Sequence, residues 1–210
     1  MKDGNSERII LDLCGGTGSW SKPYRDAGYD VRVITLPQFD VLRWRQYPEI
    51  VEPVESGRVH GILAAPPCTM FSRARSTGGD RDFRSAMGVV RACLDVVWEA
   101  RINGRLQFWA LENPMGLLRQ FLGKPVLSFE PWWYGDLHTK QTDLWGYFKN
   151  PRKVVHQRPI TVERAYHNKN SKFFSSPRCP SEYKHLKLDR AAIRAITPPA
   201  FARAFFRANP

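Results

Sequence analysis

The chain alternates short apolar runs with polar segments that contain glycine or proline. Before the fourth such run, Met87, Val90, Leu94 and Val97 recur near one face of a helix expected over residues 82–102. That helix is long enough to cross over a sheet. The four runs have the length of buried strands and stop at turn-forming residues: RIILDL at 8–13, YDVRVITL at 29–36, HGILAA at 60–65 and LQFWALENP at 106–114.

The first two expected strands enclose a glycine-rich loop and a short helix over residues 19–28. A strand, a glycine loop, a helix and a second strand within about 30 residues are typical of a parallel α/β sheet. We therefore expect an α/β fold of the Rossmann-like type, a layered domain with helices on both faces of its sheet.

After Pro114 the periodicity weakens. We expect a short helix over residues 115–123, a basic and proline-rich loop segment from 150 to about 180, and two helices over 188–196 and 198–208, the second opened by a proline. The expected parts are an α/β domain over 1–149, a small basic lobe over 150–185, and C-terminal helices over 186–210 that pack back on the α/β domain.

Positive charge is concentrated at one end of the chain. Residues 151–210 hold thirteen Lys and Arg against three acids, which gives +10 of the total net charge of +12. Such a segregated excess favours a polyanionic partner, with nucleic acid ahead of an anionic membrane surface. The alternative is that these lysines and arginines only keep the protein soluble.

The sequence lacks the patterns of secreted, membrane and zinc proteins. Its first residues contain no apolar core of signal-peptide length, and no stretch approaches the roughly 20 apolar residues that span a bilayer. The four cysteines are scattered without paired spacing, and Cys179 with His185 is too small a set of ligands for a metal. We expect a soluble cytoplasmic protein without a metal.

A glycine loop, LDLCGGTGSW, follows the first expected strand. Its spacing is not that of an ATPase phosphate loop, and it meets the dinucleotide fingerprint only in part, because Ser21 stands at the third glycine position. The second strand also lacks the acidic residue that binds a ribose. A tight strand-to-helix turn without a ligand is the alternative interpretation.

Two other strand ends carry chemically reactive groups. Cys68 follows the third strand after two prolines, and Glu112 stands at the end of the fourth. Because ligands of open α/β sheets bind at the carboxyl ends of the strands, the glycine loop, the thiol and the carboxyl group are expected to converge. Cys68 is then either a buried inert thiol or a nucleophile.

The order of these motifs resembles that of the cytosine-C5 DNA methyltransferases, which depend on S-adenosylmethionine. The glycine loop resembles the family's Asp-Leu-Phe-x-Gly-x-Gly motif, with Cys14 in the position of the Phe. Pro67-Cys68 matches the Pro-Cys motif, and Glu112-Asn113-Pro114 matches the Glu-Asn-Val motif. ITPPAFARAFF loosely matches the C-terminal helix motif. The resemblance extends from Leu11 to Phe206.

The resemblance implies a class I methyltransferase sheet and a bacterial or phage enzyme that methylates a cytosine flipped out of duplex DNA. Cys68 would add to C6 of the ring, Glu112 would act at N3, and C5 would take the methyl group without a metal. The implied cofactor contacts are Asp12, Cys14, Gly15, Gly16, Gly18, Asp40 and Pro66. The implied substrate contacts are Pro67, Ser72, Arg73, Arg75, Asn113, Lys140, Gln141 and Thr142, with Asn113 also expected to fix its loop through backbone hydrogen bonds.

The chain departs from the family in several places. HTKQTDLWG stands where the family has Gln-x-Arg-x-Arg, and Ala195 replaces the Asn of the C-terminal motif. The basic lobe is far smaller than the usual target-recognition domain, so we expect a short or relaxed recognition sequence. Its expected phosphate and stacking contacts are Lys153, Arg158, Arg164, Tyr166, Lys169, Lys172, Phe173, Phe174 and Arg178.

Two alternatives remain open at this point. The same chemistry on RNA fits the charge as well as DNA does, although we rank it lower, whereas a free nucleotide fits the basic end poorly. A catalytically inactive relative that still binds nucleic acid is the second alternative, which the altered motifs allow. We favour a monomer.

Overall fold

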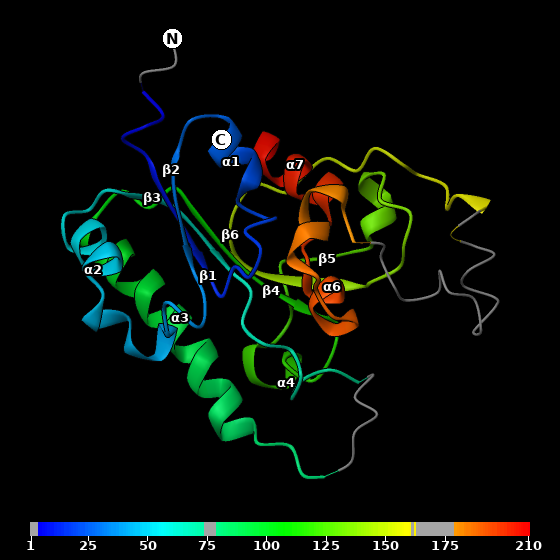
Figure 1. Ribbon diagram of the computed structural model, residues 1–210, viewed down its shortest axis with the longest axis horizontal. Coiled ribbons are helices and arrows are strands. Elements are labelled where there is room, and N and C mark those ends of the chain that lie inside the picture. The colour runs from blue at the N-terminus through cyan, green and yellow to red at the C-terminus, as the bar shows by residue number, and fades with distance from the viewer. Residues whose placement is uncertain (1–3, 74–78, 161, 163–178) are drawn as a thin grey trace.

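The computed structural model describes residues 4–73, 79–160, 162 and 179–210. Within these residues a six-stranded sheet runs in the order β2-β1-β3-β4-β6-β5 (Figure 1). The strands are β1 (Ile9–Leu13), β2 (Asp30–Ile34), β3 (Val59–Ala64), β4 (Phe108–Pro114), β5 (Leu127–Phe129) and β6 (Thr142–Tyr147).

The four strands expected from the sequence are confirmed, and they pair in parallel. β6 was not expected, and it pairs antiparallel with both β4 and β5. Polar and glycine residues interrupt its apolar pattern. Asp143 is buried because the guanidinium group of Arg119 donates to both of its carboxylate oxygens at 2.6 Å. At Gly146 a Cβ atom would collide with the carbonyl oxygen of Trp109, so only glycine fits there.

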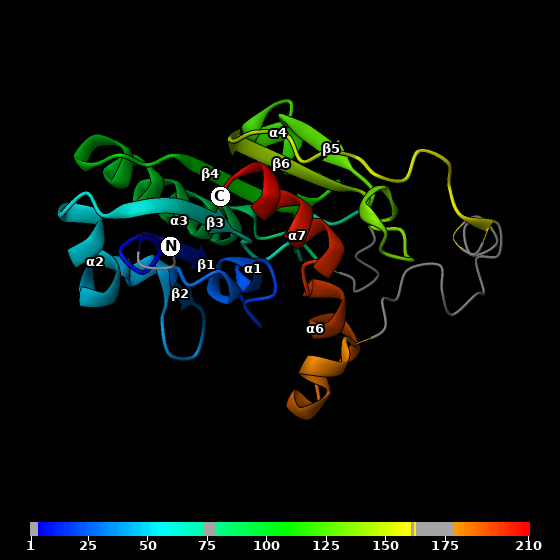
Figure 2. The same cartoon turned by 90° about the horizontal axis from the view of Figure 1, so that it is seen from above.

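Helices cover both faces of the sheet, as expected for a Rossmann-like fold (Figures 1 and 2). Since side chains alternate along a strand, Ile9, Leu11 and Leu13 face the core formed with η1, α2 and α3, whereas Ile10 faces the core formed with α1, η2 and α7. The helices of the first layer are η1 (Val41–Gln46), α2 (Pro48–Glu55) and α3 (Phe83–Asn103). Those of the second are α1 (Lys22–Asp26), η2 (Pro131–Tyr134) and α7 (Pro199–Ala208).

Three smaller helices complete the description. Only Arg119–Leu122 (α4) is helical in the segment 115–123, so that expected helix is shorter than predicted. α6 (Arg190–Ala195) and α7 confirm the two C-terminal helices, and Pro199 stands at the first turn of α7. η3 (Ser181–Leu186), like η1 and α2, was not expected. None of the helices in the described residues has the length and hydropathy of a membrane span.

The chain order of the strands reverses direction at β1. From β1 the chain moves to β2 on one side, and it then returns to β3 on the other side of β1. The connections therefore diverge between β1 and β3, and such a switch point is where open α/β sheets bind ligands, beyond the carboxyl ends of the strands. The strand order differs from the usual doubly wound order in two respects. Among the described residues no strand lies beyond β2, and β6 lies between β4 and β5 although it follows β5 in the chain.

Substitution of Phe201 tests how much the core formed with α1, η2 and α7 depends on the C-terminal helix. Its ring stacks on Phe129 at a centroid distance of 4.1 Å and is fully buried. Phe201→Ala should lower the free energy of unfolding by about 3–5 kcal/mol in urea denaturation. Trp98→Ala, on the exposed face of α3, should change it by only about 0.5 kcal/mol. Equal losses for the two variants would contradict this packing.

Candidate functional site

The glycine loop begins where β1 ends and turns sharply. Cys14, Gly16 and Gly18 all have positive φ angles of 55–69°, a conformation that favours glycine. Cys14 is held in it by a hydrogen bond from its backbone NH to the carbonyl oxygen of Ile34 at 2.7 Å. Gly15 lies against the carboxyl group of Asp12, because a Cβ atom at Gly15 would come within 2.5 Å of the Asp12 Cγ atom.

Asp12 is a fully buried carboxyl group beneath this loop. The Ser21 hydroxyl donates to its Oδ2 atom at 2.5 Å, whereas its Oδ1 atom has no hydrogen-bond partner in the described residues. Burial raises the pKa of Asp12 to about 6, although the hydrogen bond from Ser21 lowers it in part. One buried oxygen beneath the loop is therefore left for a ligand to satisfy.

The thiol of Cys14 has a partner in the core of the protein. It hydrogen-bonds with the thiol of Cys93 on α3, which lowers the pKa of Cys14 and raises that of Cys93. Cys93 is fully buried in the core between the sheet and α3. Cys14 thus anchors the loop to the core, and the loop backbone is the part that can approach a cofactor.

The double proline leads the chain from β3 to a tight turn that presents Cys68. Pro66 is buried and Pro67 is exposed. The carbonyl oxygen of Cys68 accepts hydrogen bonds from the backbone NH groups of Phe71 and Ser72 at 3.0 and 2.8 Å, which closes the turn. The backbone after Cys68 is therefore fixed, and Arg73, the last described residue before position 79, is exposed.

The end of β4 is tied to the same turn. The side-chain amide of Asn113 donates to the carbonyl oxygen of Pro66 at 3.0 Å, and Asn113 is fully buried. This is the backbone contact expected of Asn113; its contact with substrate stays a prediction. Farther along, the backbone NH of Leu117 donates to the carbonyl oxygen of Phe71 at 2.8 Å. The two motifs that carry Cys68 and Glu112 thus form one structural unit.

Glu112 and Cys68 interact electrostatically. Burial raises the pKa of the Cys68 thiol, and the negative charge of Glu112 raises it further. The positive charges of Lys140 and Arg194 act in the opposite direction. In the ligand-free protein the thiol is therefore the favoured form at neutral pH, and attack by Cys68 requires that its proton leave.

Lys140 lies beside Glu112, with 3.4 Å between its Nζ atom and the Glu112 Oε1 atom. Both side chains are largely buried, at 17% and 10% exposure, so solvent screens this pair less than a surface ion pair. Thr142 is buried, and its hydroxyl donates to the carbonyl oxygen of Lys140 at 2.7 Å. Gln141 is exposed, and its carbonyl oxygen accepts from the backbone NH of Met115. Of these three predicted substrate contacts, Lys140 is the one joined to the pair of reactive groups.

His138 is a half-buried group that the sequence reasoning missed. Burial and the nearby charge of Lys140 lower the pKa of His138 to about 4, so its ring is neutral at pH 7. Its Nε2 atom is buried without a hydrogen-bond partner in the described residues. The only sequence signal was its position two residues before Lys140 in the HTKQTDLWG segment.

The remaining predicted residues include one at the start of η1 and several outside the described residues. Asp40 caps η1, because its Oδ1 atom accepts from the backbone NH of Leu42 at 3.0 Å. Arg75 lies outside the described residues. The same holds for most of the lobe's predicted contacts: Arg164, Tyr166, Lys169, Lys172, Phe173, Phe174 and Arg178.

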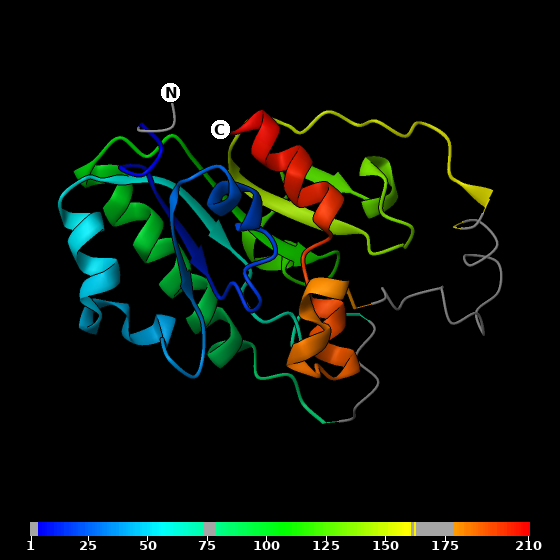
Figure 3. The ribbon, with the colours of Figure 1, turned by 45° about the horizontal axis from the view of Figure 1, so that its top comes forward.

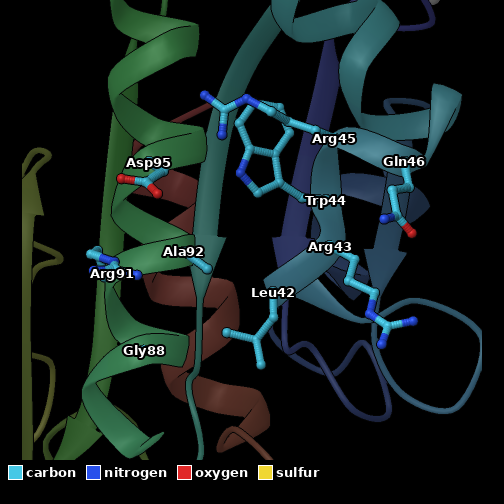
Figure 4. Close-up of a pocket in the computed structure, with 9 residues that line it drawn as sticks. All are labelled: Leu42, Arg43, Trp44, Arg45, Gln46, Gly88, Arg91, Ala92 and Asp95. Carbon is cyan, nitrogen blue, oxygen red and sulfur yellow. The ribbon is translucent and has the colours of Figure 1, made fainter. Parts of the chain in front are cut away.

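A separate groove lies between η1 and α3 (Figure 4). It is lined by Leu42, Arg43, Trp44, Arg45, Gln46, Gly88, Arg91, Ala92 and Asp95. None of these residues belongs to the glycine loop, to the Pro-Cys turn or to the end of β4. The candidate site is therefore defined by the strand ends and not by this groove.

Among the described residues, no group of three His, Cys, Asp or Glu side chains is arranged to hold a metal ion. Comparison of the chain with protein-family models and with curated proteins found no match. The functional interpretation therefore depends on the residues and their geometry.

The opposing effects of Glu112 and Lys140 on the pKa of Cys68 can be distinguished by substituting each residue in turn. Glu112→Gln removes the negative charge and should lower the pKa of Cys68, whereas Lys140→Met removes a positive charge and should raise it. The measurement is the pH dependence of iodoacetamide alkylation, followed by peptide mass spectrometry at Cys68. Shifts in the same direction for both variants would contradict the arrangement.

The buried Asp12 should make stability depend on pH. Since its pKa is raised in the folded state from 3.8 to about 6, its stabilising contribution is complete below pH 3.8 and is lost as the pH rises through 6. Asp12→Asn lacks this dependence, so its stability relative to the wild type should improve by about 2 kcal/mol between pH 4 and 7. Urea unfolding at both pH values measures it, with the exposed Asp26→Asn as control. A pH-independent difference for Asp12→Asn would refute this assignment.

Proposed function

We propose that the chain is an S-adenosylmethionine-dependent DNA cytosine-C5 methyltransferase with a class I methyltransferase sheet. One observation carries the proposal: a thiol and a carboxyl group from neighbouring strand ends share one site beside a glycine loop, and a buried hydrogen bond holds their backbones together. The sequence motifs that contain Cys68 and Glu112 suggested this function, and the geometry of the two groups supports it.

Cys68 has the chemistry of the nucleophile. Cytosine is reactive at C5 only after a group adds to C6, and a thiolate both adds and leaves readily. An electron pair of the Cys68 thiolate forms the bond from Sγ to C6, and the electrons of the C5–C6 double bond become available at C5. After C5 has gained a methyl group, loss of the C5 proton to water restores the double bond and expels the thiolate.

Glu112 supplies the complementary group. Its carboxylate can take up the proton that Cys68 loses, directly or through water, and the carboxyl group so formed can donate that proton to N3 as the ring gains electrons and accept it back when Cys68 leaves. Lys140 balances the carboxylate and opposes the rise in the pKa of Cys68. The three side chains therefore form a set in which substrate binding at Glu112 would ease the loss of the Cys68 proton.

The glycine loop fits the proposed cofactor. A Cβ atom at Gly16 would meet no atom within 4 Å, so its backbone borders open space. The unpartnered Oδ1 atom of Asp12 lies below the same loop. Asp12, Gly15, Gly16 and Gly18 would hold S-adenosylmethionine, with Asp40 on the side of β2. When bound, the cofactor supplies an electrophilic methyl group.

Methyl transfer tests the proposal. Wild-type protein with tritiated S-adenosylmethionine should label duplex DNA, and nucleoside analysis should find the label in 5-methylcytosine. Cys68→Ser should lose at least about a thousandfold in rate, and Glu112→Gln about a hundredfold or more, because each removes a reacting group.

Cys179→Ser is the matched control, since it removes a thiol distant in sequence from the site, and it should stay within about twofold of the wild type. Label in RNA but not in duplex DNA would move the proposal to RNA. No label in either nucleic acid, with the cofactor bound, would refute it.

A further inference from the structure

A basic segment of the C-terminal region lies beside the candidate site. η3 and α6 with their connection carry Lys184, Lys187, Arg190 and Arg194 against only Glu182 and Asp189. In Figures 1 and 3, α6 lies next to the glycine loop and to the segment that follows β3. The sequence had indicated only that the C-terminal helices pack back on the α/β domain.

Specific contacts fix this segment to the glycine loop. The hydroxyl of Ser19 donates to the carbonyl oxygen of Thr197 at 2.7 Å, and this contact is buried. On the other side of α6, Tyr183 is buried and hydrogen-bonds with the side chains of Ser19 and Thr17. α6 is therefore held at both ends against the loop, next to the switch point of the sheet.

The acids of the segment are already engaged. Asp189 caps α6, because its Oδ1 atom accepts from the backbone NH of Ala192 at 2.7 Å. Glu182 interacts with Tyr183 and lies near Lys22. Positive charge consequently prevails on this segment, and Arg194 is exposed.

Arg194 is the cation of this segment that acts on the reactive thiol. Its charge lowers the pKa of Cys68, so its guanidinium group lies within electrostatic range of that side chain. Arg73, five residues after Cys68, adds a second exposed cation. An anion that brings a base to Cys68 would thus meet positive charge from two separate segments.

We propose that α6 forms one side of a DNA-binding surface and that Arg194 binds the phosphate next to the flipped cytosine. The inference rests on the proposed function and goes beyond it, because it assigns a DNA contact outside both the catalytic motifs and the basic lobe. Rotation of a nucleotide out of the stack turns its backbone, so its flanking phosphates need fixed partners. An arginine suits this role because its fork of donors matches a phosphate.

The experiment measures duplex binding by fluorescence anisotropy at a series of KCl concentrations, with the full chain. Arg194→Ala should weaken binding about tenfold at low salt and reduce the slope of log K against log [KCl] by about one, because one phosphate contact is lost. Arg194→Lys should recover most of the slope.

Arg207→Ala is the matched control. Arg207 is also an exposed arginine on a C-terminal helix, but it lies near the C-terminus, where Pro210 contacts His60 at the start of β3. It therefore lies toward the amino-terminal ends of the parallel strands, opposite the ends that carry the candidate site, and its removal should leave the slope unchanged. S-adenosylmethionine affinity, measured by calorimetry, should be the same in Arg194→Ala and the wild type.

Three outcomes would overturn the inference. Wild-type slope in Arg194→Ala, or equal losses in Arg194→Ala and Arg207→Ala, would show that Arg194 binds no phosphate. A loss of cofactor affinity with intact DNA binding would assign Arg194 to the cofactor carboxylate instead. If wild-type protein methylates DNA in any of these cases, the proposed function stands and only the role of Arg194 fails; if the wild type neither binds nor methylates DNA, both fail.

Discussion

The arrangement of the site depends on one buried hydrogen bond, from the side-chain amide of Asn113 to the carbonyl oxygen of Pro66. Glu112 directly precedes the donor, and Cys68 follows the acceptor by two residues. A bond between fully buried groups is costly to leave unmade, so it restrains both strand ends strongly. The positions of the carboxyl group and the thiol are thus set by backbone structure and do not rely on contact between their own side chains.

That restraint has an electrostatic cost. Holding Glu112 near Cys68 raises the pKa of the thiol, which works against a nucleophile. Lys140 offsets this cost, and the Thr142 hydroxyl and the Glu130 carboxylate both bind the Lys140 backbone. β6, which carries this segment, therefore matters to the chemistry as well as to the sheet. In the mechanism that we propose, the site becomes reactive when substrate binding changes the charge at Glu112.

The sequence was sufficient for the parts that follow from local pattern. β1 to β4 were predictable because each is an uninterrupted apolar run, and Cys68 and Glu112 could be assigned to one edge because parallel strands end together. β6 was not, since Asp143 needs Arg119 to be buried and Gly146 is required by close approach of Trp109. The effect of Arg194 on Cys68 depends on residues distant in the chain, which no local pattern encodes.

The most direct test of the central claim is to trap the bond between Cys68 and a cytosine ring. A duplex with 5-fluorocytosine in place of cytosine lacks the proton that must leave C5, so the adduct should persist once the methyl group has been transferred. With S-adenosylmethionine present, we predict a protein–DNA species that survives denaturation, with the DNA fragment mapped to Cys68 by peptide mass spectrometry. A noncovalent complex alone, or a fragment mapped to another residue, would contradict the account.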